Sequence, residues 1–289
     1  MNILITGGTG YIGRNLVEAF LSKGDKVFLI RRETSINNIQ HENLVEIIYD
    51  GTYSSFEKIK EKIDIVYHLA TCFLVNHKTE NLEELINSNI LFGTQLLEYM
   101  AKHSIQNFIN TETYAESITG EEYNPQNLYS ATKMAFKSIL KYYVDTYNMK
   151  AISLVLSDTY GPNDTRKKFL NLVLDALKSQ DLNFKMSLGE QEICYIYIED
   201  VVNAYLKSRD LISSQGIKEL KTYSVFGNEI LTLNNLVELL EKIFNKKLST
   251  EKGYYPYRLR EIMKFNYAHI ERLPNWEPKI SLKEGVKRI

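Results

Sequence analysis

Short apolar runs alternate with longer amphipathic stretches through the first half of the chain. The stretches Glu80–His103 and Tyr129–Tyr147 have the periodicity of helices. Apolar runs separated by helical stretches are typical of strands that are buried on both faces. This pattern predicts a parallel sheet covered by helices on both sides. The apolar runs that we interpret as its strands lie at 2–5, 26–30, 45–49, 63–69, 107–110 and 151–156.

The pattern loosens after Gly161-Pro162. We therefore predict an α/β fold, with a doubly wound parallel sheet of the Rossmann type in residues 1–160. A smaller C-terminal α/β lobe, mainly for substrate binding, is expected in residues 161–289, with segments from about 193 to 228 returning to the main sheet. The elements expected in this second half are a strand at 194–198 and helices at 169–179, 199–210 and 232–245.

A glycine-rich turn, Thr6-Gly7-Gly8-Thr9-Gly10-Tyr11-Ile12-Gly13, separates the first apolar run from the first amphipathic stretch. A strand, a glycine turn and a helix in this order are typical of a dinucleotide-binding site. Glycine permits a tight turn, a close approach of the diphosphate to the backbone and close packing of helix on strand, and the helix N-terminus offers free N–H groups. A purely structural turn is the alternative interpretation. The residues that we expect at the cofactor are Gly7, Thr9, Gly10, Tyr11, Ile12 and Gly13.

Two arginines, Arg31 and Arg32, end the second predicted strand. Sites that prefer NAD normally place an acidic side chain there, which binds the adenosine ribose. Guanidinium groups instead suit a 2′-phosphate, so we favour NADP(H) over NAD(H), with solvated surface arginines as the alternative. Asp50, after the third run, is a candidate acceptor for the adenine amino group or an exposed loop aspartate.

Tyr129 and Lys133 lie four residues apart on a predicted helix and therefore share one face. A lysine cation is expected to lower the pKa of a neighbouring phenol, which favours proton exchange with a substrate carbonyl or hydroxyl. The preceding strand ends near Thr111 and Thr113, and either hydroxyl is a candidate to orient the reacting oxygen. High β-propensity is the alternative explanation for these threonines.

Composition limits the function classes. The chain has 289 residues, with 35 Lys and Arg against 36 Asp and Glu, so we expect neither a nucleic-acid partner nor attraction to a membrane surface. The first predicted strand begins at residue 2, and we expect no signal peptide. Two distant cysteines, Cys72 and Cys194, favour a reduced, cytoplasmic protein, and the five histidines show no metal-ligand spacing.

Several motifs follow one another along essentially the whole chain, and together they resemble the extended short-chain dehydrogenase/reductase family. This family contains nucleotide-sugar epimerases, dehydratases and reductases. The details are most similar to reductases of the CDP-abequose synthase type, which act on CDP- or dTDP-linked 4-keto-6-deoxyhexoses. The motifs are Thr6-Gly7-x-x-Gly10-x-x-Gly13, His68-Leu69-Ala70, Asn89–Thr94, Asn110–Thr113, Tyr123–Tyr129, Tyr129-x-x-x-Lys133, Asp158–Asp164, Tyr197–Val201, Tyr257-Arg258 and Leu273–Pro278.

The resemblance implies NADPH-dependent reduction of such a 4-keto group, in deoxysugar biosynthesis for surface polysaccharide. It places Thr113, Tyr129 and Lys133 in catalytic positions, with Lys133 also holding the cofactor ribose. It further implies a homodimer formed by the two long helices of the first half. The other residues implied are Leu69, Ala70 and Thr71 at the cofactor, and Thr111, Asp158 and Arg258 at the nucleotide sugar, with Arg258 toward its diphosphate.

The chain departs from the family pattern at two places. Tyr114-Ala115 follow Thr113 where dehydratases have an Asp-Glu pair, which disfavours a dehydratase. Asp158 replaces the asparagine that is usual in epimerases. A nucleotide-sugar 4-epimerase with tightly bound NAD remains the alternative, because it uses the same catalytic residues. A non-catalytic dinucleotide-binding module is disfavoured, since Tyr129 and Lys133 are both present.

Overall fold

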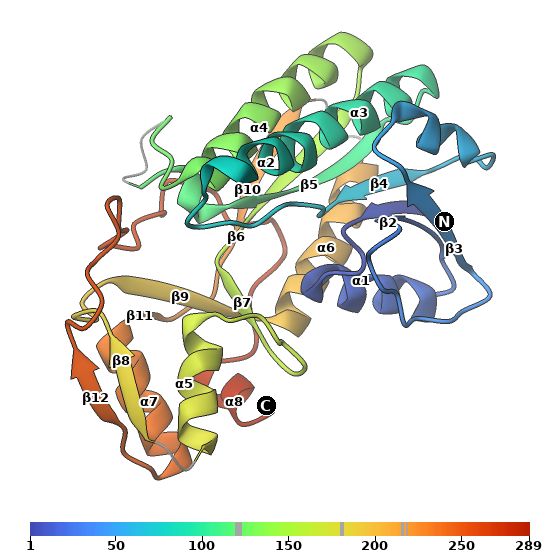
Figure 1. Cartoon of the computed structure of the whole chain (residues 1–289). Coiled ribbons are helices and arrows are strands. Elements are labelled where there is room, and N and C mark those ends of the chain that lie inside the picture. The colour runs from blue at the N-terminus through green and yellow to red at the C-terminus, as the bar shows by residue number, and fades with distance from the viewer. Residues whose placement is uncertain (119–122, 180–181, 215–216, 218) are drawn as a thin grey trace.

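A sheet of seven parallel strands forms the centre of the molecule (Figure 1). The computed structural model describes residues 1–118, 123–179, 182–214, 217 and 219–289. The predicted doubly wound α/β class is confirmed. In their order across the sheet the strands are β10 (Leu220–Val225), β6 (Lys150–Leu156), β5 (Asn107–Thr113), β4 (Ile65–His68), β1 (Asn2–Thr6), β2 (Lys26–Arg32) and β3 (Leu44–Tyr49).

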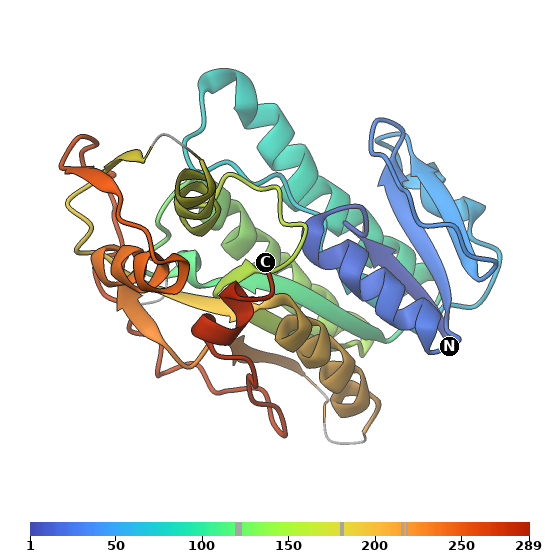
Figure 2. The same ribbon diagram turned by 90° about the horizontal axis from the view of Figure 1, so that it is seen from below.

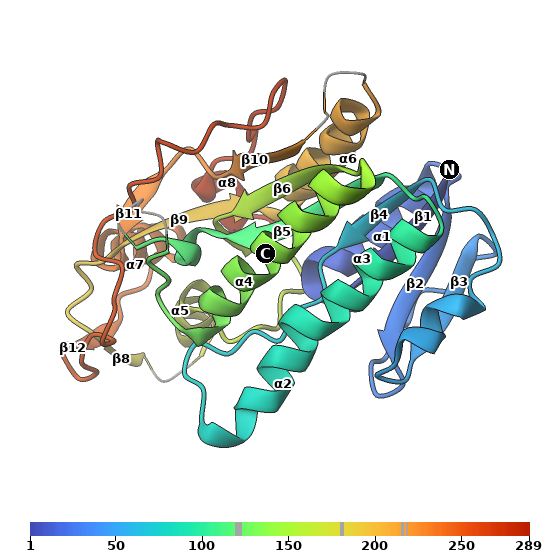
Figure 3. The same ribbon diagram turned by 90° about the horizontal axis from the view of Figure 1, so that it is seen from above.

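Helices cover both faces of this sheet, as Figures 2 and 3 show from opposite sides. The helices on one face are α1 (Tyr11–Ser22) and α6 (Ile198–Ser213), and those on the other are α3 (Phe92–Lys102) and α4 (Leu128–Tyr147). Successive residues of a strand point alternately toward the helices on one face of the sheet and toward those on the other. In β1, Ile3 and Ile5 pack with α1 and α6, whereas Leu4 packs with α3 and α4.

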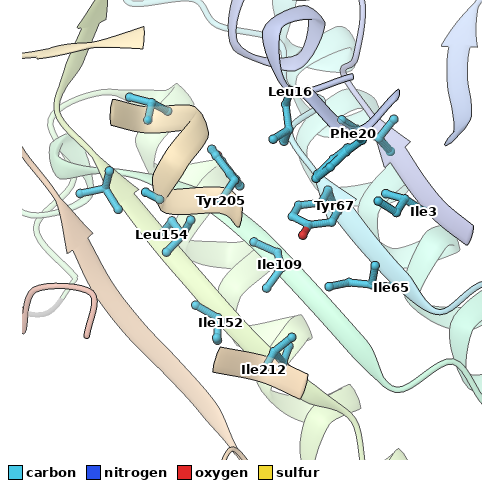
Figure 4. Packing of buried hydrophobic residues seen from close by; sticks show 14 of the residues in the cluster. Ile3, Leu16, Phe20, Ile65, Tyr67, Ile109, Ile152, Leu154, Tyr205 and Ile212 are labelled. Carbon is cyan, nitrogen blue, oxygen red and sulfur yellow. The ribbon is translucent and has the colours of Figure 1, made fainter. Parts of the chain in front are cut away.

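Aliphatic and aromatic side chains fill the layer between the sheet, α1 and α6 (Figure 4). Ile65 of β4, Ile109 of β5 and Ile152 of β6 are fully buried there. The rings of Phe20 and Tyr67 meet with centroids 4.8 Å apart. Burial on both faces explains why the interior strands β1 and β4 carry consecutive apolar residues, Ile3-Leu4-Ile5 and Ile65-Val66-Tyr67, rather than an alternating pattern.

The amphipathic stretch expected as one helix at 80–103 is a compound element that covers residues 79–102. The 3₁₀ turn η2 (Thr79–Asn81) leads into α2 (Leu82–Ile86), and a π-helical turn, η3 (Asn87–Leu91), joins α2 to α3. Two further 3₁₀ turns follow β3 and β5, namely η1 (Tyr53–Lys58) and η4 (Tyr114–Glu116).

A smaller lobe packs beside the carboxyl ends of the main strands (Figure 1). Its two small sheets have the orders β11-β9-β7 and β12-β8. Within the segment expected to return to the main sheet, β10 pairs with β6, whereas β9 pairs with β7 and β11. The elements of this lobe are β7 (Asp158–Tyr160), α5 (Phe169–Lys178), β8 (Asn183–Met186), β9 (Glu192–Tyr197), β11 (Ile230–Thr232), α7 (Leu233–Phe244), β12 (Ser249–Lys252) and α8 (Leu282–Val286).

The C-terminal segment is fastened to the beginning of α6. The indole N–H of Trp276 donates to the carbonyl oxygen of Asp200 at 3.1 Å, and the backbone N–H of Ile280 donates to its carboxylate at 3.0 Å. These bonds hold the end of the chain against the main domain. None of the helices described has the length and apolar character that a membrane span requires.

The π-helical turn places Asn89 where it links three parts of the main domain. Its side chain is buried and accepts hydrogen bonds from the Cys72 N–H at 2.7 Å and the Thr71 hydroxyl at 3.0 Å. Its amide group donates to the Cys72 carbonyl at 3.1 Å and to the Thr132 hydroxyl at 2.9 Å. Asn89 thereby ties the loop after β4 to α4.

We expect Asn89→Leu to lower the free energy of unfolding by about 3 kcal/mol, because the isosteric side chain leaves several buried polar groups without partners. Urea denaturation measures this change. Asn87→Leu, at an exposed position of the same π turn, is the matched control and is expected to change stability by less than about 0.5 kcal/mol. Equal stability of the two variants contradicts the assignment.

Candidate active site

A cleft of about 1490 Å³ lies at the carboxyl ends of the main strands, between the sheet and the C-terminal lobe. Open parallel sheets bind ligands at this edge. The predicted site residues that line the cleft are Gly7, Thr9, Gly10, Tyr11, Ile12, Gly13, Arg31, Arg32, Leu69, Ala70, Thr71, Thr111, Thr113, Tyr129, Asp158 and Arg258. Two other predicted residues, Asp50 and Lys133, do not line it.

The glycine turn brings the beginning of α1 close to two neighbouring segments. Gly7 has φ +72°, and a Cβ there would lie 2.5 Å from the backbone nitrogen of Ala70. A Cβ at Gly13 would lie 2.1 Å from the Gly7 carbonyl oxygen. Gly10 caps α1 without a side-chain hydrogen bond, so the first N–H groups of the helix stay free for an anionic ligand.

The two arginines at the end of β2 have different surroundings. The Arg31 side chain forms an ion pair with Glu46 at 2.5 Å and donates to the Ser35 carbonyl oxygen at 3.0 Å. The Arg32 side chain is 64% exposed, and its nearest carboxylate, on Glu84, is 3.8 Å away. Arg31 therefore organises the loop after β2, while Arg32 keeps most of its donors available in the cleft.

Asp50 has a local structural role. Its Oδ1 atom accepts hydrogen bonds from the N–H and hydroxyl of Thr52, at 2.9 and 2.6 Å, and from the Ser55 hydroxyl at 2.7 Å. These bonds lower the pKa of Asp50 to about 2. The neighbouring residues Tyr49 and Gly51 line the cleft, but the predicted contact of Asp50 itself with adenine stays a prediction.

The two threonines of β5 differ in what their hydroxyl groups bind. The Thr111 hydroxyl lies 2.6 Å from the hydroxyl of Tyr205, a fully buried residue of α6. The Thr113 hydroxyl oxygen accepts the Ala115 N–H at 3.3 Å at the beginning of η4. Because this bond uses the oxygen as an acceptor, the hydroxyl hydrogen of Thr113 remains available to a ligand.

Tyr129 and Lys133 lie in the first two turns of α4, which begins after the cap formed by Asn127. Burial raises the pKa of the Tyr129 phenol, and the nearby Glu116 carboxyl raises it further. Burial lowers the pKa of the Lys133 ammonium, against the opposing effect of Glu116 and Glu112. The expectation that the phenol pKa is lowered is therefore wrong for this structure, because desolvation of the charged form dominates.

Asp158, the first residue of β7, connects η4 of the main domain to the C-terminal lobe. Its carboxylate accepts the Tyr114 hydroxyl at 2.8 Å and forms an ion pair with Lys168 at 2.9 Å. Burial raises the pKa of Asp158, but Lys168 and the two hydrogen bonds outweigh it and keep the pKa below its usual range. The aspartate that replaces the epimerase asparagine is thus a charged, paired group.

A basic segment of the C-terminal lobe escaped the sequence analysis. Arg166, Lys167 and Lys168 all line the cleft. The Arg166 guanidinium pairs with the Asp164 carboxylate at 2.7 and 2.8 Å and lies 4.4 Å from the centroid of the Tyr11 ring. The sequence feature that could have identified this segment is the run of three consecutive cations shortly after the Gly-Pro turn. Because Arg166 contacts Tyr11 at the beginning of α1, the segment joins the glycine-turn end of the cleft to the C-terminal lobe.

Phe73 and Glu116 also lacked a role in the sequence analysis. Phe73 lines the cleft, and its ring meets that of Tyr129 edge-on, with centroids 4.9 Å apart. The Glu116 carboxylate accepts the Thr113 N–H at 3.0 Å. Both contacts join segments whose proximity depends on the fold. No group of His, Cys, Asp and Glu side chains suited to a metal ion occurs among the residues described.

Comparison with known proteins gives consistent matches. The model of the NAD dependent epimerase/dehydratase family matches residues 3–218. A CDP-abequose synthase from Yersinia pseudotuberculosis is 30% identical over 274 residues, which cover 93% of this chain and 93% of the relative. The CDP-abequose synthase of Salmonella typhimurium is 27% identical over 299 residues, covering 99% and 96%.

A solved structure shares the fold of the whole chain. The UDP-glucose 4-epimerase of Thermus thermophilus, in complex with NAD, superposes with a TM-score of 0.81 over 99% of this chain and 97% of its own, at 22% sequence identity. At this level of identity the likeness establishes a common architecture.

We expect Gly10→Ala to weaken dinucleotide binding at least tenfold, because a methyl group at the bare cap of α1 stands where the diphosphate approaches the backbone. Calorimetric titration with NADPH and NADH measures the loss. The unliganded variant is expected to stay folded with a small decrease in unfolding temperature, since Gly10 has φ −75° and a Cβ there makes one tight contact, 3.2 Å from the Gly7 carbonyl oxygen. Undiminished affinity for both dinucleotides contradicts this placement of the cofactor.

Proposed function

This chain belongs to the NAD dependent epimerase/dehydratase family, and within that family we propose that it uses NADPH to reduce the 4-keto group of a CDP- or dTDP-linked 4-keto-6-deoxyhexose. It is an NAD(P)-dependent oxidoreductase of the extended short-chain dehydrogenase/reductase type. The observation that carries the proposal is the buried Tyr129 phenol, held protonated in the cleft that the glycine turn also lines. The similarity to two CDP-abequose synthases supports the choice of substrate.

The residues present fit a dinucleotide. The close approaches at Gly7 and Gly13 leave a bare turn for a diphosphate, and the uncapped beginning of α1 supplies N–H donors. Arg32 extends the same side of the cleft and suits a 2′-phosphate. The bound cofactor supplies the hydride that is added to the keto carbon.

Side chains of the protein supply the proton that completes the reduction and determine when it is released. Hydride addition to a ketone places negative charge on its oxygen, and the Tyr129 hydroxyl donates the proton that completes the alcohol. A raised pKa keeps that proton on the phenol until the stronger base, the alkoxide, develops. The free hydroxyl hydrogen of Thr113 donates a hydrogen bond to the same oxygen. Lys133 stabilises the phenolate that remains.

The surroundings of Thr113 oppose a dehydratase. Elimination of water needs a free acid and base next to the reacting sugar. Tyr114 donates its hydroxyl to Asp158, and Ala115 has no functional group. Glu112 is buried and paired with Lys137 at 2.8 Å. Glu116, the carboxyl of η4, accepts the Thr113 N–H at 3.0 Å, so the carboxyls of β5 and η4 next to Thr113 are both bound to groups of the protein.

A nucleotide-sugar 4-epimerase with tightly bound NAD is the second candidate, because it uses the same three catalytic residues. The NAD-bound epimerase that shares the fold favours it. The two candidates differ in cofactor turnover. A screen of CDP- and dTDP-4-keto-6-deoxyhexoses with NADPH and NADH, followed by the absorbance of the reduced nicotinamide, tests the proposal. Net oxidation of NADPH supports the reductase, and purified protein that retains NAD without net turnover supports the epimerase.

The proposal places the enzyme in the cytoplasm as a homodimer. The helices α2 and α4 present exposed apolar side chains at Leu82, Ile86, Tyr142 and Tyr147. Such a face supports association with a second copy of the chain.

We expect Tyr129→Phe to lower kcat by about a hundredfold or more, because the alkoxide then lacks its proton donor. Steady-state rates of NADPH oxidation measure the loss, and calorimetry is expected to show nearly unchanged affinity for NADPH. Tyr142→Phe, at an exposed tyrosine of the same helix, is the matched control and is expected to retain full activity. Similar rates for the two variants contradict the role of Tyr129.

We expect Arg32→Ala to raise the KM for NADPH about tenfold and to leave the KM for NADH nearly unchanged, because it removes a donor to the 2′-phosphate alone. Arg31→Ala is the comparison. It releases Glu46 and the Ser35 carbonyl, so it is expected to weaken both cofactors by disordering the loop after β2. Equal effects of Arg32→Ala on the two cofactors oppose NADP(H) as the preferred cofactor.

A further inference from the structure

Glu116, the last residue of η4, holds Thr113 by two linked contacts. Its Oε1 atom accepts the Thr113 N–H at 3.0 Å, and the Thr113 Oγ1 atom accepts the Ala115 N–H at 3.3 Å. Together these bonds form a capping box around the turn. Since the N–H of Ala115 occupies an acceptor site of the hydroxyl oxygen, the box fixes the direction in which that hydroxyl points.

The same carboxyl lies among the charged groups that surround the reacting residues. Glu112 of β5 and the cations Lys133 and Lys137 of α4 act on it electrostatically. Lys137 is committed to Glu112 by a 2.8 Å ion pair in which the Glu112 side chain is only 1% exposed. Glu116 also acts electrostatically on the Tyr129 phenol. It is therefore connected with all three residues assigned to the reaction.

We propose that Glu116 is a positioning residue of the reduction, which directs the Thr113 hydroxyl into the cleft and acts through its charge on Tyr129 and Lys133. The inference rests on the proposed function, because it assigns Glu116 to the same proton transfer. Glu116 acts through Thr113 and Lys133.

The charge on Glu116 is expected to change within the working range of the enzyme. Burial and the neighbouring Glu112 raise the pKa of the Glu116 carboxyl to about 8. The hydrogen bond from the Thr113 N–H and the positive charges of Lys133 and Lys137 lower this pKa, but by less. Below that pH the carboxyl is mainly neutral. Above it the carboxylate forms, and its negative charge raises the pKa of Tyr129 and of Lys133. Burial alone keeps the proton on Tyr129, whereas Lys133, whose pKa burial lowers, retains its proton to higher pH than it would without Glu116.

The pH profile of kcat with a 4-keto nucleotide sugar tests this role. We expect Glu116→Gln, which keeps an acceptor for the Thr113 N–H but has no charge, to lose activity at alkaline pH about one unit earlier than the unmodified enzyme. Glu116→Ala loses the acceptor as well, so its kcat at pH 7 is expected to fall about tenfold, clearly more than in Glu116→Gln. Glu57→Gln, at a carboxylate of η1 outside the cleft, is the control for charge removal and is expected to follow the unmodified profile. An alkaline limb that does not move in Glu116→Gln overturns the proposal.

A second measurement needs no substrate. In protein labelled with ¹³C at the glutamate carboxyl, NMR is expected to show one resonance that titrates near pH 8 and is absent from Glu116→Gln. Lys133→Met removes a cation that lowers the pKa of Glu116, so this resonance is expected to titrate at still higher pH. If Glu116 completes its titration below about pH 6, the inference fails. Silence across the sugar panel removes the proposed function instead, and the NMR titration separates the two failures.

Discussion

The close approach of α1 to the carboxyl end of β1 is the constraint on which the cleft depends. Side chains at Gly7 or Gly13 would overlap the backbone of the loop after β4 or of the turn itself. With glycine at both positions, the uncapped N-terminus of α1 and the Leu69–Thr71 segment face the same space. Because α1 also packs on β1 through its apolar side, the binding turn is supported by the core that Figure 4 shows.

Burial controls the protonation of the reacting groups. A low-dielectric environment favours the neutral form of any titratable group, so one cause raises the pKa of Tyr129 and lowers that of Lys133. The neighbouring carboxyls of Glu112 and Glu116 oppose the effect of burial on the lysine, and Glu116 adds to it on the phenol. The result is a proton donor that stays protonated beside a cation whose charge depends on those carboxyls.

The C-terminal lobe completes the site through a few polar contacts. Asp158 of β7 joins Tyr114 of η4 to Lys168, and Arg166 covers the ring of Tyr11 at the beginning of α1. These contacts bring basic side chains of the C-terminal lobe to the end of the cleft that the glycine turn occupies. The two halves of the molecule thus share one cleft, even though the C-terminal lobe has its own small sheets.

The sequence by itself determined the parallel sheet, its flanking helices and the glycine turn, because these follow from local periodicity and from the conformations that glycine allows. It also determined which residues follow the strands, so most predicted site residues, including Thr113 and Tyr129, line the cleft. Tertiary structure alone decided the place of β10 at the edge of the main sheet, the local pairing of Arg31 and Asp50, and the raised pKa of Tyr129. Each of these depends on burial or on partners set by folding, and side-chain spacing along the chain does not report them.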